Sequence, residues 1–251
     1  MVCTQPYGHG MASRTKRERL LTALRRDVPD RVPKWIQPGA HLQELVESNT
    51  DSVDPAAYFD LDITEFVRCS PSTHRRDFSD YHADVDPKRV DEGGVIRWGE
   101  PAPLRGIQSA DDVARFPFPD VGAKYRFKKL RDQITGLKSR GLPVINGYVP
   151  GTYEQLCALR GMEDFLVDLI QEPEFLQPCL DTVSALKAQI VARYAESGVD
   201  VIWTGDDLGS ETRMLMAPET WRKHLKSCVR KIVDAAKSVN PEILVAFHSD
   251  G

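Results

Sequence analysis

The sequence has few cysteines and no long apolar or basic run, and each absence excludes a class of protein. The five cysteines are an odd number, and no two of them have Cys-x-x-Cys spacing. This pattern excludes a disulfide-based scaffold and the common structural zinc sites. No apolar stretch reaches about 18 residues, so we expect no membrane-spanning helix and no membrane partner. Lys and Arg form no extended cluster, so we expect no nucleic-acid partner.

The composition is instead that of a folded globular protein. Of the 251 residues, 41% are hydrophobic and 28% are charged, and the formal net charge is −4. A chain of this length can bury a large core. Residues 1–12 are polar and lack the apolar segment of a secretory signal, so we interpret them as a disordered leader and expect a cytoplasmic protein. We expect residues 13–251 to form one domain.

Apolar periodicity from about residue 120 predicts alternating helices and buried strands. The predicted helices cover about 123–139, 152–170, 173–198 and 218–239, and the predicted strands cover 143–148, 199–203 and 243–247. Thr152 and Gln155 have the spacing of a capping box, which predicts the start of the second of these helices. The N-terminal part is predicted to contain a helix over 15–26, a short strand over 32–36 and a helix over 40–47. Helices that alternate with apolar strands are typical of a parallel sheet covered by helices. We therefore predict an α/β protein with a (β/α)8 barrel.

The predicted strands number about four to five, fewer than the eight of a closed barrel. Residues 51–119 follow a less regular pattern, which we interpret as an insertion in the barrel. The last predicted strand, 243–247, has no helix after it to cover the sheet edge. We therefore expect 13–251 to be an incomplete barrel whose C-terminal part is missing.

Polar residues follow the predicted strands, where parallel α/β folds build their active sites. The four strand ends carry Gln37 and His41; Asn146, Tyr148 and Tyr153; Thr204, Asp206, Asp207 and Glu211; and His248, Ser249 and Asp250. We expect Trp35 to be either a core residue or a pocket wall. Tyrosines at a barrel mouth often only form the wall of a pocket, and we favour that role for Tyr148 and Tyr153 over a catalytic one.

Two pairs of residues are the main candidates for chemistry. Asp206 and Asp207 are adjacent carboxylates directly after a buried strand, where desolvation and repulsion raise a carboxyl pKa. Their alternative role is an Asx turn and helix cap. His248 and Asp250 point the same way in an extended chain. They would bind a metal, or Asp250 would orient the imidazole, or His248 would only form a hydrogen bond at the barrel mouth. A metal site needs more ligands than these two.

A set of short motifs gives the sequence a family resemblance. The motifs are Thr15-Lys16-Arg17-Glu18-Arg19, Pro29-Asp30-Arg31-Val32-Pro33, Leu159-Arg160-Gly161-Met162-Glu163, Gly205-Asp206-Asp207-Leu208-Gly209, Pro218-Glu219-Thr220-Trp221-Arg222 and Ala246-Phe247-His248-Ser249-Asp250-Gly251. In this order and spacing, the chain resembles the uroporphyrinogen decarboxylase superfamily. That superfamily contains decarboxylases and methylcobamide-linked methyltransferases. The resemblance implies a (β/α)8 barrel longer than this chain.

The chain departs from both kinds of relative. The decarboxylases have an Arg-Gln-Ala-Gly-Arg segment after the first strand, whereas residues 35–41 here contain no arginine. Without these guanidinium groups, a polycarboxylate substrate would lose strong ion pairs. The family's catalytic aspartate has only a loose match in Asp62. Thiol-alkylating methyltransferases have His-x-Cys as zinc ligands, and this chain has His248-x-Asp250, a harder ligand pair.

The resemblance is therefore nearest to the methyltransferase-like branch. It implies methyl transfer from a small methylated or methoxylated substrate to a corrinoid protein. His248 and Asp250 would bind a divalent metal such as zinc, or act as an acid on the leaving heteroatom. Asp206 and Asp207 would orient the substrate, and Trp35, Gln37 and Tyr148 would line its pocket. The alternatives are tetrapyrrole decarboxylation and a non-catalytic ligand-binding barrel.

Overall fold

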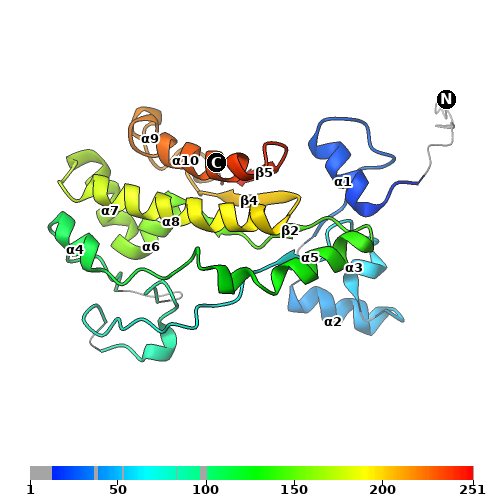
Figure 1. Cartoon of the computed structure of the whole chain (residues 1–251), viewed down its shortest axis with the longest axis horizontal. Coiled ribbons are helices and arrows are strands. Elements are labelled where there is room, and N and C mark those ends of the chain that lie inside the picture. The colour runs from blue at the N-terminus through cyan, green and yellow to red at the C-terminus, as the bar shows by residue number, and fades with distance from the viewer. Residues whose placement is uncertain (1–12, 37–38, 53, 83, 97–100, 251) are drawn as a thin grey trace. The chain divides into compact units, whose positions relative to one another are not determined.

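The computed structural model describes residues 13–36, 39–52, 54–82, 84–96 and 101–250, coloured along the chain in Figure 1. The chain divides into two compact units. The first unit contains the residues up to 66 together with 135–144, and the second contains 67–134 and 145–251. Among the described residues, no helix is both long and apolar enough to cross a membrane.

The first unit contains the helices α1 (Lys16–Leu24), α2 (Ala40–Asn49) and α3 (Pro55–Tyr58). The α1 helix begins with a capping box: the Thr15 hydroxyl accepts the Glu18 N–H, and the Glu18 carboxylate accepts the Thr15 N–H. The α3 helix begins after Asp54, whose carboxylate accepts the Ala56 N–H at 2.9 Å. These caps satisfy N–H groups that a helix leaves without internal partners. The first helix is confirmed within two residues at its C-terminal end.

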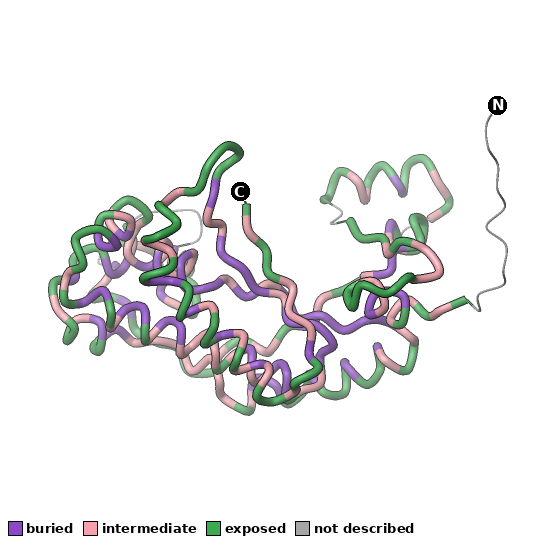
Figure 2. Tube along the Cα trace, turned by 90° about the horizontal axis from the view of Figure 1, so that it is seen from above, coloured by how far each residue is buried: buried purple, intermediate pink, exposed green. Residues whose placement is uncertain are grey.

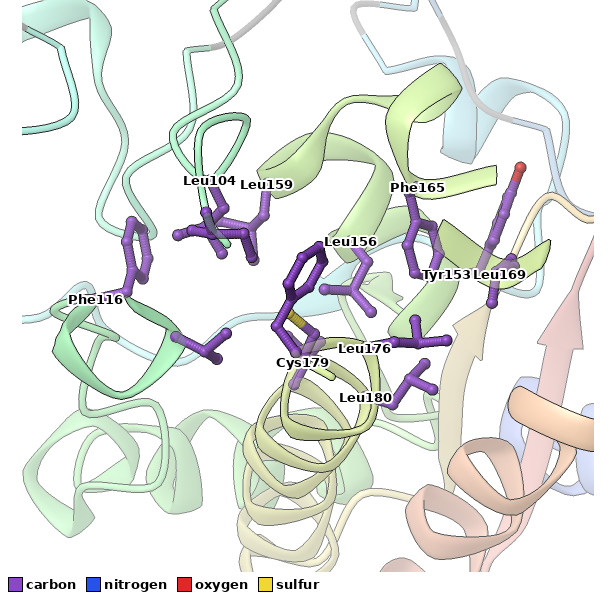
Figure 3. Close-up of a cluster of buried hydrophobic side chains, with 14 of the residues drawn as sticks. Leu104, Phe116, Tyr153, Leu156, Leu159, Phe165, Leu169, Leu176, Cys179 and Leu180 are labelled. Atoms are coloured by element: carbon purple, nitrogen blue, oxygen red, sulfur yellow. The ribbon is translucent and has the colours of Figure 1, made fainter. Parts of the chain in front are cut away.

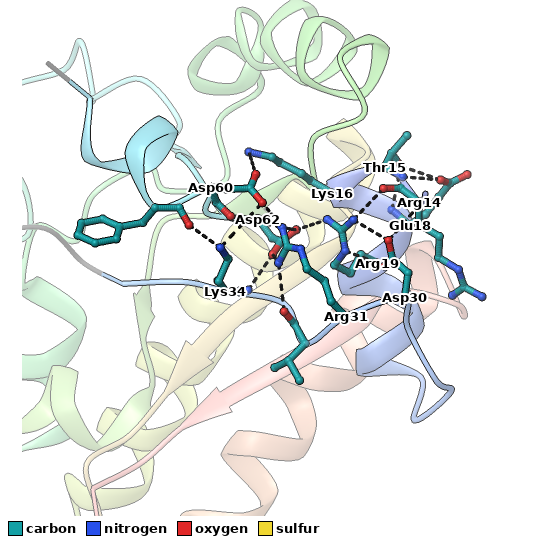
Figure 4. A network of polar contacts seen from close by, with 12 residues as sticks. Arg14, Thr15, Lys16, Glu18, Arg19, Asp30, Arg31, Lys34, Asp60 and Asp62 are labelled. Carbon is teal, nitrogen blue, oxygen red and sulfur yellow. Dashed lines mark hydrogen bonds and ion pairs between the residues drawn. The ribbon is translucent and has the colours of Figure 1, made fainter. Parts of the chain in front are cut away.

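A network of ion pairs centred on Asp62 connects distant segments of the first unit (Figure 4). The Asp62 side chain is fully buried, and its carboxylate accepts hydrogen bonds from Arg19 Nη1 at 2.6 Å and from Arg31 Nη1 at 2.7 Å. Arg19 also makes two hydrogen bonds of 2.7 Å to Asp30. Asp62, the loose match to a catalytic aspartate, is thus enclosed by cations that hold the first unit together.

The same carboxylate explains why the strand predicted over 32–36 is irregular backbone. The Lys34 N–H donates to the Asp62 carboxylate at 2.8 Å, and the Asp62 N–H donates to the Lys34 carbonyl at 2.8 Å. A side chain here occupies a backbone donor that a strand would use in a ladder. Pro33 also has no N–H to contribute. The prediction of a strand in this segment was therefore wrong.

The second unit is built on a parallel sheet. Its strands are β1 (Phe66–Val67, at the boundary of the units), β2 (Ile145–Asn146), β3 (Val149–Pro150), β4 (Val201–Gly205) and β5 (Leu244–His248). The strands β2, β3 and β5 each pair with β4 in parallel, and β1 lies beside β2. Four of the five β4 residues are buried, as the near-continuous apolar run predicts. The parallel sheet is confirmed, although only β2 lies within the strand predicted over 143–148, and β3 follows directly after that range.

Helices cover this sheet and connect its strands. They are α4 (Ala110–Arg115), α5 (Leu130–Ser139, across the boundary of the units), α6 (Thr152–Arg160), α7 (Met162–Gln171), α8 (Leu176–Ser197), α9 (Pro218–His224) and α10 (Lys226–Val239), with 3-10 turns η1 (Pro87–Arg89) and η2 (Lys124–Phe127). The helices α8 and α10 pack side by side (Figure 1). The helix predicted over 123–139 starts only at Leu130, because η2 has the tighter 3-10 winding. The helix predicted over 218–239 divides at Leu225.

The apolar core of the second unit lies between α6, α7, α8 and the segment 104–116 (Figure 3). Leu156, Leu180 and Phe165 are each at most 1% exposed. Arg160, from one of the family-like motifs, closes the corner between α6 and α7: its Nε is 2.7 Å from Asp168 Oδ2, and its guanidinium lies 5.3 Å from the Phe175 ring centroid. Arg160 therefore has structural contacts.

The Asp62 network leads to a prediction about stability. Asp62→Ala leaves the buried Arg19 guanidinium with one fewer anionic partner, so we expect the free energy of unfolding to fall by about 3–5 kcal/mol. Asp60→Ala is the matched control, since Asp60 pairs with Arg31 and Lys16 at the exposed edge of the network. We expect a much smaller loss there. Urea unfolding of both variants measures the difference, and equal losses would contradict the assignment.

Candidate active site

The candidate site lies where β3, β4 and β5 end. Because these strands are parallel, their carboxyl ends lie at one edge of the sheet. The register pairs Pro150 with Gly205 and Gly205 with His248, so the residues that follow each strand are neighbours. The tube in Figure 2 changes from mostly buried along β4 to exposed over residues 210–214 of the loop that follows it. Polar side chains from three separate chain segments meet at this edge.

Three of these side chains form a compact cluster. His248 Nε2 lies 3.4 Å from Asp207 Oδ1 and 3.7 Å from Asp250 Oδ1. The Asp250 N–H donates to Asp207 Oδ1 at 3.3 Å. One ligand atom from each residue lies within 4.8 Å of the others, which is close enough for a shared metal ion. The structure therefore brings the predicted pair His248 and Asp250 together and adds Asp207 as a third donor.

A partly buried carboxylate, Glu154, connects this cluster to Tyr148. Glu154 Oε1 accepts the Tyr148 hydroxyl at 2.5 Å and the Asp207 N–H at 3.0 Å. The Tyr148 ring lies edge-on to the His248 imidazole, with ring centroids 5.9 Å apart, and it also contacts Trp203 at 5.2 Å. Burial raises the pKa of Glu154, and burial together with the Glu154 hydrogen bond raises the pKa of Tyr148 above its usual range.

Sequence reasoning did not identify Glu154 as a site residue. Its only signal is its position, the third residue of a helix that begins directly after a strand end. Acidic residues are common in the first turn of a helix because they interact favourably with the helix dipole. The usual interpretation of Glu154 would therefore be structural, and only the tertiary contacts with Tyr148 and Asp207 indicate more.

Asp206 directly follows β4 and is buried next to the cluster. Its carboxylate caps the N-terminus of α6. It is 1% exposed, and its Oδ1 accepts the Glu154 N–H at 2.9 Å. Its own N–H donates to the His248 carbonyl at 3.1 Å. Among the described residues, its Oδ2 has no hydrogen-bond partner. Burial raises the Asp206 pKa from 3.8 to about 7, and the Glu154 hydrogen bond opposes that rise.

This arrangement corrects the sequence prediction for the start of α6. The spacing of Thr152 and Gln155 suggested a capping box. Instead Gly151 is the N-cap residue, Thr152 is the first helical residue, and the Thr152 hydroxyl is buried with no partner among the described residues. A side chain at position 151 would collide with the Asp206 carboxylate. The N-cap residue of α6 is therefore a glycine, and the capping side chain is that of Asp206, which is distant in the sequence.

The other residues at the predicted strand ends have mainly structural contacts. Asn146 bridges to the backbone of Trp203, accepting its N–H at 2.8 Å and donating to its carbonyl at 3.0 Å. The buried Thr204 hydroxyl donates to the Val149 carbonyl at 2.8 Å. Ser249 Oγ accepts the Leu208 N–H at 3.3 Å. Tyr153 is 2% exposed and belongs to the core.

The predicted pocket residues from the N-terminal part belong to the first unit. Trp35 is 41% exposed, and its ring packs edge-on against Phe66 at 5.7 Å. Gln37 lies outside the described residues. His41 is exposed on α2, and Glu211 is exposed in the loop after β4.

The raised pKa of Asp206 predicts a specific pH dependence of stability. Between about pH 4 and pH 7 the folded chain retains a proton that the unfolded chain releases, so this contribution is complete at low pH and is lost as the pH rises through 7. The slope is about 1.4 kcal/mol per pH unit for one proton. We expect Asp206→Asn to reduce the decline in unfolding free energy between pH 5 and pH 8. Parallel denaturant titrations in a chelator test this, and identical pH profiles would refute it.

The close contact at Gly151 gives a second prediction. Gly151→Ala places a methyl group against the Asp206 carboxylate, so we expect overpacking to lower stability by about 1–3 kcal/mol. Gly136→Ala is the control, because Gly136 lies within α5 and a Cβ there meets nothing within 4 Å. That substitution should raise stability by about 0.5–1 kcal/mol. Thermal unfolding distinguishes the two, and a neutral Gly151→Ala variant would contradict the described packing.

Comparisons with known proteins agree with this architecture. The family model described as uroporphyrinogen decarboxylase (URO-D) matches residues 96–251, more than half of the chain. The solved structure of a methyltransferase from Methanosarcina mazei is 22% identical, with a TM-score of 0.55, and the match covers 95% of this chain and 70% of that one. This likeness shows a shared fold, and no curated protein matches the chain. The five described strands and their covering helices are accordingly part of a (β/α)8 barrel. The chain belongs to the uroporphyrinogen decarboxylase family.

Proposed function

We propose that this chain carries the active site of an enzyme that transfers a methyl group from a small methylated or methoxylated molecule to a corrinoid protein. The observation that supports this most directly is the cluster of Asp207, His248 and Asp250 at the strand ends, beside Tyr148 and Glu154. The similar fold of a protein described as a methyltransferase also supports it.

The donor set of the cluster suits a divalent metal. One imidazole nitrogen and two carboxylate oxygens are ligands that zinc accepts, and three protein ligands leave a coordination position for substrate. With no thiolate, the set is harder than His-x-Cys and also suits other divalent ions. Asp207, His248 and Asp250 would hold the ion. When bound, it would polarise the heteroatom that carries the methyl group.

The surrounding residues would position this chemistry. Glu154 holds the Tyr148 hydroxyl and the Asp207 N–H at the same oxygen, which fixes the ring beside His248 and the backbone of one donor. Asp206, buried beneath them, would act through Glu154 by capping its helix and would not touch substrate. Supporting contacts of this kind orient the groups that bind a substrate or metal.

The methyl transfer itself needs an acid or an electrophile at the leaving heteroatom. As the acceptor attacks the methyl carbon, the bond from carbon to heteroatom breaks and its electron pair remains on the heteroatom. A proton from His248, half-exposed at the strand end, would neutralise that atom in the absence of a metal. A single nitrogen of His248 cannot be both a metal ligand and a proton donor. The two roles therefore predict different effects of substitutions in the cluster.

Tetrapyrrole decarboxylation is the second candidate, since the matching family model is described by that activity. It would use arginines to hold the substrate carboxylates. The segment 35–41 has none, which favours methyl transfer. The third alternative, a non-catalytic ligand-binding barrel, does not account for the cluster of Asp207, His248 and Asp250.

Substitutions in the cluster test the proposal in the purified protein. We expect His248→Ala to lower the rate of donor-dependent cobalamin methylation by at least about 10²-fold, the lower range for loss of an acid–base group. Glu242→Gln, an exposed carboxylate beside the amino end of β5, should leave the rate unchanged. Decarboxylation of uroporphyrinogen in place of methyl transfer would support the second candidate, and a fully active His248→Ala enzyme would exclude both roles of this residue.

Metal analysis separates ligation from proton transfer. If the cluster binds a metal, Asp207→Asn and Asp250→Asn should each lower the bound metal and the rate together. If Asp250 only orients the imidazole, Asp250→Asn should reduce the rate less than His248→Ala does. Elemental analysis of the purified variants, with Glu242→Gln as reference, provides the measurement.

A further inference from the structure

A separate cavity lies in the segment 71–92 of the second unit. Its volume is about 510 Å³, within the usual range of about 300–1,000 Å³ for small-molecule pockets. None of the residues of the proposed active site lines it. Its lining includes the apolar Phe78, Val85 and Val90 and the charged Arg75 and Arg76.

Packing against the core holds the walls of this cavity in place. Phe78 is 9% exposed and packs against Phe116, with ring centroids 5.6 Å apart. His82 is 5% exposed, and its Nε2 is 2.7 Å from the Gly94 carbonyl. Gly94 has a φ of +82°, and any Cβ at this position would overlap the Phe78 ring. The cavity is thus anchored to the apolar core through two buried side chains.

The charged groups of the lining differ in whether they have partners. Its carboxylates all accept hydrogen bonds from this chain: Asp77 from the Ser79 N–H at 2.9 Å, Asp91 from the Gly93 N–H at 2.8 Å, and Glu92 from the Ser72 N–H at 2.7 Å. Within the part of the chain that the structure describes, Arg75 and Arg76 make neither a hydrogen bond nor an ion pair. The free charged donors of the cavity are therefore two adjacent guanidinium groups.

The imidazole of His82 adds one unsatisfied polar atom. Because the Gly94 carbonyl can only accept, His82 Nε2 must donate to it, which assigns the tautomer. In the neutral ring Nδ1 then has a lone pair. This nitrogen is buried with no partner among the described residues. A buried acceptor without a donor is costly, so a ligand hydroxyl or N–H here would be favoured.

We propose that this cavity binds a small organic anion, a carboxylate or a phosphate ester, that has an apolar body. Arg75 and Arg76 hold the anionic group through charge-assisted hydrogen bonds, for which the planar guanidinium is well suited. The apolar body lies against Phe78 and Val85, and a hydroxyl or N–H of the ligand donates to His82 Nδ1.

Calorimetric titration of the whole chain with 6-hydroxy-2-naphthoate tests this site, because the probe combines a carboxylate, an apolar body and a hydroxyl. We expect one saturable site per chain and much weaker binding of the uncharged 2-naphthol. The double variant Arg75→Gln, Arg76→Gln should weaken binding of the naphthoate at least about tenfold, or about 1.4 kcal/mol. Both arginines are exposed, so the variant should fold normally.

The matched control is Lys88→Gln, Arg89→Gln, which removes two exposed charges from the same segment outside the cavity lining. We expect this control to keep the affinity within about twofold. Equal losses in both double variants would show a general charge effect, and an unchanged affinity in the first would place the probe elsewhere. Either result, or the absence of saturable binding to the unaltered chain, overturns the proposal. A titration with 2-naphthyl phosphate distinguishes phosphate from carboxylate as the preferred group.

Discussion

The contact between the Asp206 carboxylate and the first turn of α6 determines the geometry of the candidate site. A strand end supplies the cap that the helix lacks in its own sequence, since Gly151 has no side chain to offer. The cap fixes the position of Glu154, and Glu154 in turn fixes the Tyr148 hydroxyl and the Asp207 N–H. The position of each group in this series of contacts therefore depends on the group before it. The series runs from the buried Asp206 carboxylate to the exposed cluster around His248.

This arrangement places a costly group in the interior. Burying a carboxylate disfavours its charged form, and the pKa of Asp206 rises as a result. The helix N-terminus and the positive charge of Lys187 both offset part of that penalty. Groups held in such an unfavourable state are often found at functional sites, where position counts more than stability. The polar contacts of Asp206 and Glu154 are consistent with that view.

Different kinds of contact fix the structure of the two units. The first relies on ion pairs that enclose Asp62 and connect α1 with the segments 30–34 and 60–62. The second relies on the apolar core between α6, α7 and α8, with the Arg160–Asp168 ion pair at its edge. A buried ion pair specifies geometry but adds little net energy, whereas apolar burial adds energy without direction. The candidate site lies in the unit with the apolar core.

The sequence by itself determined the class of fold and indicated where the candidate site would lie. Apolar runs such as Val201–Trp203, set between predicted helices, indicate buried strands, and in a parallel sheet the residues that follow them, Asp207 and His248, lie at one edge. The tertiary structure alone decided which polar groups touch. The spacing of Thr152 and Gln155 indicated a local cap, yet Asp206 occupies that place from 52 residues away in the sequence. Likewise, Asp62 replaces a strand partner for Lys34, and Glu154 joins Tyr148 to Asp207. Local patterns report the periodicity of burial, whereas a buried polar atom takes whichever partner the fold brings within hydrogen-bond distance.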